Sequence, residues 1–95
     1  MRLRYTLDAL NHVAEIHSYI VERNPRAATQ VIMRIRAAAE RLRKFPHIGH
    51  IGAAPGTLEW VVRGLPYVIV HEVDPDADEV LILGVFHGAR DREQR

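Results

Sequence analysis

Two stretches in the first half of the chain carry apolar residues at the three-and-four spacing of one helix face. In the first, over about residues 8–23, these positions are Ala9, Leu10, Val13, Ile16 and Ile20. The second begins at Asn24 and Pro25, because asparagine caps a helix and proline is tolerated at its first position. Its apolar stripe comprises Ala28, Val31, Ile32, Ile35, Ala38, Ala39, Leu42 and Phe45. We therefore expect two antiparallel helices joined at Asn24-Pro25.

Beyond Phe45 the helical period gives way to short runs rich in β-branched residues. Pro46 ends the second helix, because proline disfavours the helical conformation in the residue before it, and the glycine-containing stretch 47–56 predicts a loop. Strands are expected at residues 2–6, 58–62, 67–73 and 80–86, and short turns make the last three antiparallel neighbours. The predicted fold class is α+β, an antiparallel sheet packed on an N-terminal helix hairpin in the order β-α-α-β-β-β.

Composition is that of one folded domain without disulfides. The chain has 95 residues, of which 47% are hydrophobic and 26% charged, and it contains no cysteine. This length predicts a single domain over residues 1–95, and the lack of cysteine excludes a disulfide framework and a thiolate metal cage. The first residues are too poor in apolar length for a signal peptide, and no run approaches the roughly 20 apolar residues of a membrane span. We expect a cytoplasmic protein without membrane contact.

The net charge of +1 is the sum of two oppositely charged segments. Residues 23–44 contain seven basic residues against the single acid Glu40, a local charge of +6, whereas residues 72–79 contain five acids and no base. A dipolar chain of this kind can offer an acidic partner one face and repel it from another. A solvated helix face and an acidic turn are nevertheless the commoner meaning of such runs.

Directly after the last strand, His87 and Arg90 form the pair of side chains that a ribonuclease would use. A histidine moves protons near neutral pH, and an arginine holds a phosphate in a bidentate fork. Arg63 and His71, on or near the adjoining strand, could join them. On residue types alone a structural role is the commoner outcome, with His87 bonded to a loop carbonyl and Arg90 paired with an acid.

Other candidate residues favour structure over chemistry. His47 and His50 supply only two metal ligands, with no cysteine or acid beside them in the loop, so we expect no metal and no cofactor. His12 and His17 are five apart on the first helix, a spacing that does not place them on one face. Trp60 lies in the middle of a strand, where its ring either completes the core or anchors a contact.

A series of short motifs, taken in order, resembles the RelE/ParE family of toxins from type II toxin–antitoxin systems over nearly the whole chain. The motifs are Ala9 with Ile16 and Tyr19-Ile20, Asn24-Pro25-x-Ala27-Ala28, Leu42-x-x-Phe45-Pro46-x-x-Gly49, Pro66-Tyr67-Val68-Ile69-Val70 and His87-Gly88-Ala89-Arg90-Asp91. Each is weak alone, whereas their order and spacing together are specific. The resemblance implies the same fold of two helices on an antiparallel sheet.

The family resemblance leaves two branches that differ in target. The RelE branch cuts mRNA in the ribosome, whereas the ParE branch poisons DNA gyrase and has no accepted catalytic site. Val68 follows the strand tyrosine where the RNA-cutting branch has an arginine, and valine cannot stabilise a phosphorane. His87 is followed by Gly88 rather than tyrosine, and the chain ends at Arg95 without that branch's late catalytic tyrosine. A charge of +1 also gives weak support for an rRNA partner. We favour a ParE-like gyrase poison that is not an enzyme.

Two positions depart from the ParE pattern as well. ParE-like chains often carry an arginine near the position of Leu58, and here Arg63 could replace that contact. The family often has aspartate where this chain has His12.

Under the ParE branch, the resemblance implies a cognate antitoxin as protein partner, in a hetero-oligomer, and DNA gyrase as target. DNA would be contacted only through the toxin–antitoxin complex, and the outcome would be growth arrest in the service of plasmid or chromosome maintenance. The antitoxin would lay a segment that is disordered when free over an apolar groove between helices and sheet, folding as it binds. The residues expected to bind the target are Trp60, Arg63, Tyr67, His87 and Arg90.

Two alternatives remain open. If the chain is an enzyme, it is a RelE-like endoribonuclease, ribosome-dependent or free, with His87 as acid–base and Arg63 and Arg90 on the phosphate. The other alternative is a non-toxic, antitoxin-binding component of a repressor.

Overall fold

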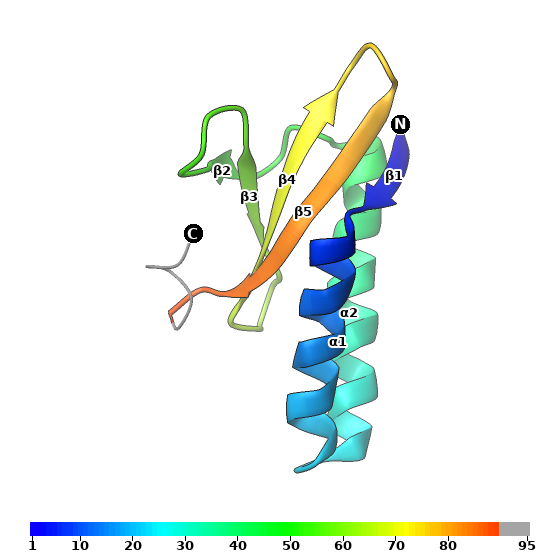
Figure 1. The fold of residues 1–95 in the computed structure, drawn as a ribbon, viewed down its shortest axis with the longest axis vertical. Helices are drawn as coiled ribbons and strands as arrows, with labels where there is room; N and C mark the ends of the chain where they lie inside the picture. Colours follow the sequence, from blue (N-terminus) through cyan, green and yellow to red (C-terminus); the bar gives the residue numbers. More distant parts are fainter. Residues whose placement is uncertain (90–95) are drawn as a thin grey trace.

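The computed structural model describes residues 1–89 as a sheet with a helix hairpin along one of its faces (Figure 1). The elements follow in the order β1 (Arg2–Tyr5), α1 (Leu7–Val21), α2 (Pro25–Lys44), β2 (His50–Ile51), β3 (Leu58–Val61), β4 (Tyr67–Asp74) and β5 (Glu79–His87). The α+β fold class and the helix hairpin predicted from the sequence are confirmed. Neither helix in this part of the chain combines the length and apolar composition needed to cross a membrane.

Both helices begin at a capping side chain. Thr6 caps α1, where its hydroxyl oxygen accepts the N–H of Ala9 at 3.1 Å. Asn24 caps α2, where its side-chain oxygen accepts the N–H of Ala27 at 3.1 Å and Pro25 occupies the first helical position. These bonds satisfy N–H groups that have no partner inside the helix. The predicted start of α2 at Asn24-Pro25 is therefore confirmed.

The strands form one five-stranded sheet in the order β1-β5-β4-β3-β2. The pairs β3 with β4 and β4 with β5 are antiparallel, as the short turns predict. Two features differ from the sequence prediction. β1 pairs in parallel with β5, so the sheet is mixed, and β2 forms inside the predicted loop and pairs antiparallel with β3. The β1–β5 pairing joins strands from opposite ends of the sequence, which a local pattern does not reveal, and β2 has only two residues, too few to show an alternation.

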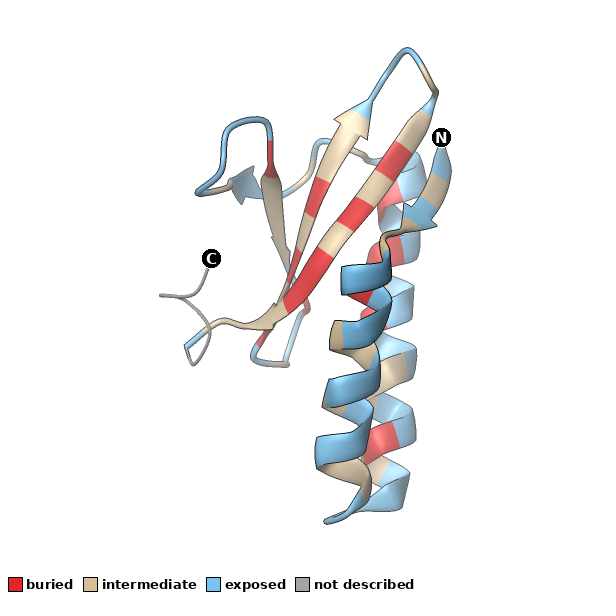
Figure 2. Ribbon diagram, in the orientation of Figure 1, coloured by how far each residue is buried: buried red, intermediate tan, exposed pale blue. Residues whose placement is uncertain are grey.

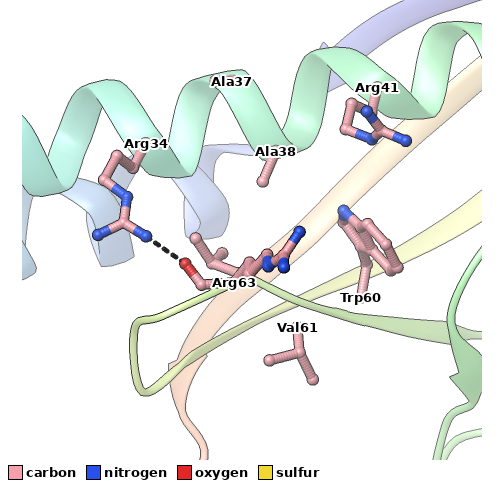
Figure 3. A pocket seen from close by; sticks show the side chains of 8 residues that line it. Arg34, Ala37, Ala38, Arg41, Trp60, Val61 and Arg63 are labelled. Carbon is pink, nitrogen blue, oxygen red and sulfur yellow. Dashed lines mark hydrogen bonds between the residues drawn. The ribbon is translucent and has the colours of Figure 1, made fainter.

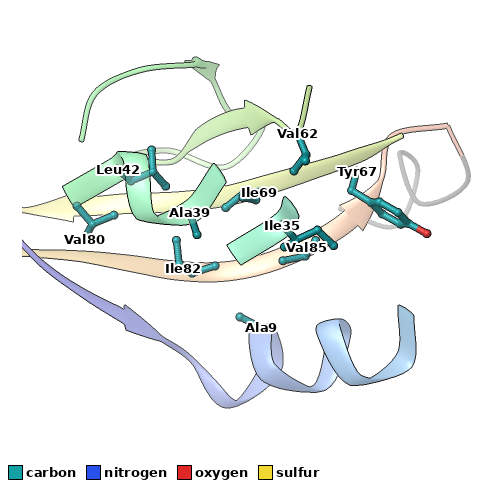
Figure 4. Packing of buried hydrophobic residues seen from close by; sticks show 10 residues of the cluster. All are labelled: Ala9, Ile35, Ala39, Leu42, Val62, Tyr67, Ile69, Val80, Ile82 and Val85. Carbon is teal, nitrogen blue, oxygen red and sulfur yellow. The ribbon is translucent and has the colours of Figure 1, made fainter. Parts of the chain in front are cut away.

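The core lies between the helix hairpin and the facing side of the sheet (Figure 4). Figure 2 shows burial alternating along β5, as expected for a strand packed on one face. The buried cluster comprises Ala9, Ile35, Ala39, Leu42, Val62, Tyr67, Ile69, Val80, Ile82 and Val85. For two residues of the predicted apolar stripes the prediction is wrong. Leu10 and Phe45 do not belong to the core, because they are 50% and 48% exposed. Leu10 lies beside Ala9 on the outer side of the first turn, and Phe45 has left the helical conformation.

Beyond the end of β1, side chains at the start of helix α1 form hydrogen bonds with the exposed edge of β5. The hydroxyl of Thr6 donates to the carbonyl of Leu83 at 3.2 Å. Nearly two turns further along, Nδ1 of His12 accepts the backbone N–H of Val85 at 3.2 Å, and the ring packs on Phe86 with centroids 4.8 Å apart. A side-chain acceptor thus replaces a strand partner at an otherwise open edge. An aspartate at position 12 could accept the same hydrogen bond.

Gly49 has a physical reason to be glycine. Its φ is 109°, in the region that side chains rarely adopt, and a Cβ there would collide with the backbone carbonyl oxygen of Glu59. The close approach lets the chain enter β2 and pair with β3. The glycine at the end of the motif that begins at Leu42 is therefore required by backbone geometry.

Candidate functional site

A groove of about 390 Å³ lies between helix α2 and strand β3 (Figure 3). Three arginines surround it, and its other side chains are aliphatic or aromatic. The lining residues are Arg34, Ala37, Ala38, Arg41, Trp60, Val61, Val62 and Arg63. We call this feature the arginine groove.

Helix periodicity and strand register bring these side chains together. Arg34 and Arg41 are seven residues apart, about two turns of helix, and therefore lie along one side of α2. On the strand, Trp60 pairs with Ile69, which is fully buried on the helix-facing side of the sheet. Because register partners project to the same face, Trp60 faces α2. Val61, the next residue, points to the opposite side (Figure 3).

The polar groups of the arginine groove are N–H donors. Arg34 donates a hydrogen bond to the backbone carbonyl of Arg63, which ties the β3–β4 turn to α2. Nε1 of Trp60 is buried and has no hydrogen-bond partner among residues 1–89. The guanidinium of Arg41 lies 5.8 Å from the ring centre of Phe45, and neither Arg41 nor Arg63 takes part in a salt bridge within the described chain. Within residues 1–89, the groove therefore holds two guanidinium groups without a carboxylate partner, those of Arg41 and Arg63.

The structure divides the predicted target-binding residues into two places. Trp60 and Arg63 line the arginine groove. Tyr67 and His87 do not, and instead pair across β4 and β5 with ring centroids 5.8 Å apart and an interplanar angle of 87°. Tyr67 is only 6% exposed, whereas His87 is half-buried. Arg90 lies outside the described residues.

His71 does not join His87, contrary to the sequence hypothesis. On the β4–β5 ladder His87 pairs with Tyr67 and His71 with Ile82, so His71 lies four residues, or roughly 13 Å, along the strand from the His87 pair. Its side chain is fully buried, and its Nε2 contacts the carbonyl of Pro46 at 3.1 Å. Burial lowers the pKa of His71 below the ordinary 6.5, since the charged form loses solvation. This histidine is part of the buried core and does not line the arginine groove.

His47, in the loop before β2, and His50, the first residue of β2, are both exposed. Within residues 1–89, no group of three or more metal-ligating side chains lies close enough together to hold an ion.

Two residues of the arginine groove, Arg34 and Arg41, are not among the candidate residues that the sequence indicates. A signal for them exists in the spacing, because two arginines two turns apart flank Ala37 and Ala38 on one side of α2. The charges of this segment indicate only a generally basic helix. Without the register of β3, nothing indicated which of its arginines would face the sheet.

A helix hairpin on a five-stranded sheet, with a basic groove between α2 and β3, is the arrangement to compare with known proteins. The chain matches the model of the ParE toxin of the type II toxin–antitoxin system parDE over residues 3–92. It therefore belongs to the ParE toxin family, within the ParE/RelE superfamily of type II toxins.

Two curated relatives and two solved structures are similar to the chain. The putative toxin Y4kP of Sinorhizobium fredii is 37% identical over 86 residues, covering 90% of this chain and 86% of that protein. Toxin RelE2 of Caulobacter vibrioides is 34% identical over 87 residues, covering 90% and 93%. The chromosomal ParDE system of P. aeruginosa has a TM-score of 0.83 at 20% identity, covering 92% of this chain and 95% of that one. The E. coli RelBE complex has a TM-score of 0.70 at 16% identity, covering 94% and 98%. These two structures share the fold.

Proposed function

We propose that the chain is a ParE-like toxin that binds DNA gyrase, stabilises the state in which DNA is cut but not resealed, and is held silent by a cognate antitoxin. The observation that carries the proposal is the chemistry of the arginine groove. Its lining contains guanidinium and indole N–H groups but no histidine, carboxylate or other side chain that exchanges protons near neutral pH. Such a site suits binding of a protein surface better than cleavage of a bond.

The proposed target-binding residues form two sets. Trp60 and Arg63 belong to the arginine groove. Tyr67 and His87 lie at the end of β5, and Arg90 follows them in the chain. Together with the helix hairpin they make up the surface that we propose to contact gyrase, and blocked replication and growth arrest follow from that contact in the cytoplasm.

An antitoxin partner is supported by the similar structures, which are the ParDE toxin–antitoxin system of P. aeruginosa and the RelBE toxin–antitoxin complex of E. coli. In the present chain, the antitoxin would place a segment that folds on binding between α2 and the sheet. By occupying the groove it would keep the toxin from its target. We propose that DNA is contacted only through this hetero-oligomer.

The alternative function is endoribonuclease activity, with His87 as acid–base and Arg63 and Arg90 on the phosphate. It is favoured by the relative named toxin RelE2. One observation argues against a ribonuclease. Val68 pairs in register with Val61 on β3 and with Phe86 on β5, so the side chains at this place in the sheet are apolar. A phosphate-binding guanidinium at position 68 is replaced there by a valine.

Expression of the chain in a bacterial host with and without its co-encoded antitoxin separates the alternatives. DNA damage signalling and transcript integrity are followed in parallel after induction. We expect DNA damage signalling with intact transcripts, reversed by antitoxin. Rapid mRNA cleavage with intact DNA would establish the ribonuclease alternative instead, and growth without arrest would point to the non-toxic repressor component.

A further inference from the structure

Strand β5 has an open edge beyond the point where its pairing with β1 ends. Residues 84–87 pair with β4 on one side, whereas the β1 pairing on the other side ends at Ile82. Along that open edge, Nδ1 of His12 on α1 accepts the backbone N–H of Val85 at 3.2 Å. His12 therefore supplies the acceptor that a neighbouring strand would otherwise supply.

The ring of His12 is held against the strand by close packing. Its centroid lies 4.8 Å from that of Phe86, and the two ring planes meet at 54°. Both rings occupy the space beside Gly84, where a Cβ would lie 2.6 Å from Cε2 of Phe86 and 3.0 Å from Cε1 of His12. These distances are shorter than the roughly 3.5–4.0 Å of a favourable carbon contact, so the packing needs glycine at this position. The close fit keeps Nδ1 directed at Val85.

The hydrogen bond also specifies the protonation state of His12. A backbone N–H can only donate, so Nδ1 must carry a lone pair and the ring must be neutral, with its proton on Nε2. In a charged imidazole both nitrogens are donors, so no flip of the ring would offer Val85 an acceptor. Histidines change charge near neutral pH, whereas an aspartate remains an acceptor down to about pH 4. Mild acid therefore removes the bond that His12 makes.

We propose that His12 is an acid-sensitive positioning residue for the end of β5. The neutral ring fixes the Val85 N–H to α1, and protonation of Nδ1 breaks that bond and leaves the strand edge unpaired at this point. A charged imidazole is still attracted to an aromatic face, so the ring keeps its contact with Phe86 and the change stays local. The released segment leads directly to His87, the last residue of β5.

Charged and titratable groups lie near this imidazole in three directions. On the same helix, Asp8 and Glu15 lie four residues before it and three residues after it, which is the spacing of neighbours on a helix surface. On the sheet, Glu59 lines the same hollow as Phe86, and His87 follows Phe86 on β5. Carboxylates ordinarily titrate near pH 4, below the range in which histidines do. His87 is therefore the neighbour whose titration has to be separated from that of His12.

Nuclear magnetic resonance of the isotope-labelled full chain, from about pH 7.5 to about pH 5.5, tests the proposal. The ring signal of His12 and the amide signal of Val85 are expected to titrate with the same midpoint. Over that titration the protection of the Val85 amide against hydrogen exchange, corrected for the intrinsic pH dependence of exchange, should fall about tenfold, which corresponds to one hydrogen bond.

Four variants assign the effect to one residue. His12→Asp keeps an acceptor that stays ionised over this range, so the Val85 amide should remain protected throughout. His12→Phe keeps a ring but no acceptor, so that amide should be unprotected even at the highest pH; if this variant does not fold, His12→Asp carries the comparison. His17→Gln is the matched control, because His17 is exposed on the same helix. In His17→Gln and in His87→Gln, the Val85 titration should match that of the wild type.

Several results would overturn the proposal. One is a His12 ring that titrates while the Val85 amide does not respond, and another is a His12 ring that stays neutral over the whole range. A Val85 titration that persists in His12→Asp, or that disappears in His87→Gln, would assign the effect to a different group.

The consequence for target binding rests on the proposed function and has a separate readout. Linear DNA formed by purified gyrase is compared for the wild type and His12→Asp at about pH 7.5 and about pH 6. We expect equal activity at the higher pH and a loss in the wild type alone at the lower pH, since the variant corrects for the pH dependence of gyrase. Equal activity at both values would refute a role of His12 in positioning the target-binding surface. If neither protein produces linear DNA at either pH, the proposed function fails, and the Val85 titration still decides the structural proposal.

Discussion

The gyrase and ribonuclease hypotheses assign different roles to His87, which lies at the end of β5. Its imidazole stands edge-on to Tyr67, with centroids 5.8 Å apart, and it does not line the arginine groove. We predict that His87→Gln keeps most of the toxicity, because glutamine can still donate and accept hydrogen bonds. Growth arrest is measured after induction of the wild type and the variant at equal protein level.

Loss of a general acid–base group would have a much larger effect, about 10²- to 10⁴-fold in rate. A His87→Gln protein that folds and binds antitoxin but no longer arrests growth would therefore move His87 into a catalytic role. Arg90→Ala is expected to weaken toxicity by either mechanism, so it serves as a control for sensitivity and does not discriminate.

The buried His71 gives the protein a predictable response to pH. Its pKa is lowered below 6.5, chiefly by burial, so in acid the unfolded chain takes up a proton that the folded chain resists. The contribution of His71 to the free energy of unfolding is therefore fully present above pH 6.5 and is lost as the pH falls below that value. Urea unfolding at a series of pH values from about 7.5 to about 5.5 measures this slope.

The variants His71→Gln and His50→Gln identify the origin of that slope. Glutamine at position 71 can still donate to the Pro46 carbonyl but does not titrate, so the slope should become shallower. His50 is exposed, and its replacement should leave the slope as in the wild type. An identical slope in His71→Gln and the wild type would refute the assignment.

At the scale of single residues, the sequence indicates which side chains could bind a target or transfer a proton, but not which of them lie close together in the fold. Trp60 and Arg63 were expected at a contact surface, and the fold brings them to one groove. His71 is expected near His87 because it lies on the adjoining strand, yet the strand register and the buried side of the sheet separate them. Orientation relative to a distant helix is a property of packing that a linear pattern does not contain.

Among the elements, helix α2 has the clearest local origin, and its start can be tested. Asn24 accepts the N–H of Ala27 at 3.1 Å, and no backbone acceptor within the helix could replace it. We predict that Asn24→Ala lowers the free energy of unfolding by about 1 kcal/mol, without changing toxicity per folded molecule. Thermal and urea unfolding provide the measurement.

Asn24→Ser is the matched control, because serine keeps a capping oxygen and should preserve most of the stability. If Asn24→Ala melts like the wild type, the cap makes no measurable contribution and the account of this helix start is wrong.

The helices and strands that the sequence predicts correctly are those specified by neighbouring residues. The cap at Asn24, the proline after Phe45 and the short turns beside β4 are local signals, and the elements that they predict are present in the structure. β2 was missed because two residues, His50 and Ile51, are too few to show an alternation. The parallel pairing of β1 with β5 joins the first and last strands, and no pattern within either strand specifies it.

At the scale of the whole molecule, the basic and acidic segments of the sequence lie in different places on the fold. The arginine groove lies along α2 and the β3–β4 turn, whereas the acidic turn follows β4 at its other end. Some of the acidic charge is compensated by the first strand, where Arg4 pairs with Glu79 at 3.1 Å. The chain thus presents a basic groove to partners while its net charge stays near neutral, which fits protein recognition better than binding to a long polyanion.

Purified gyrase provides the most direct test of the central claim that the chain is a gyrase poison. The chain is incubated with gyrase, ATP and negatively supercoiled plasmid, the DNA is deproteinised with detergent and protease, and the linear fraction is measured on a gel. The account predicts linear DNA that increases with toxin, requires gyrase and disappears when the co-encoded antitoxin is added first. Unchanged plasmid in this assay, together with cleavage of mRNA by the same preparation on ribosomes, would contradict it.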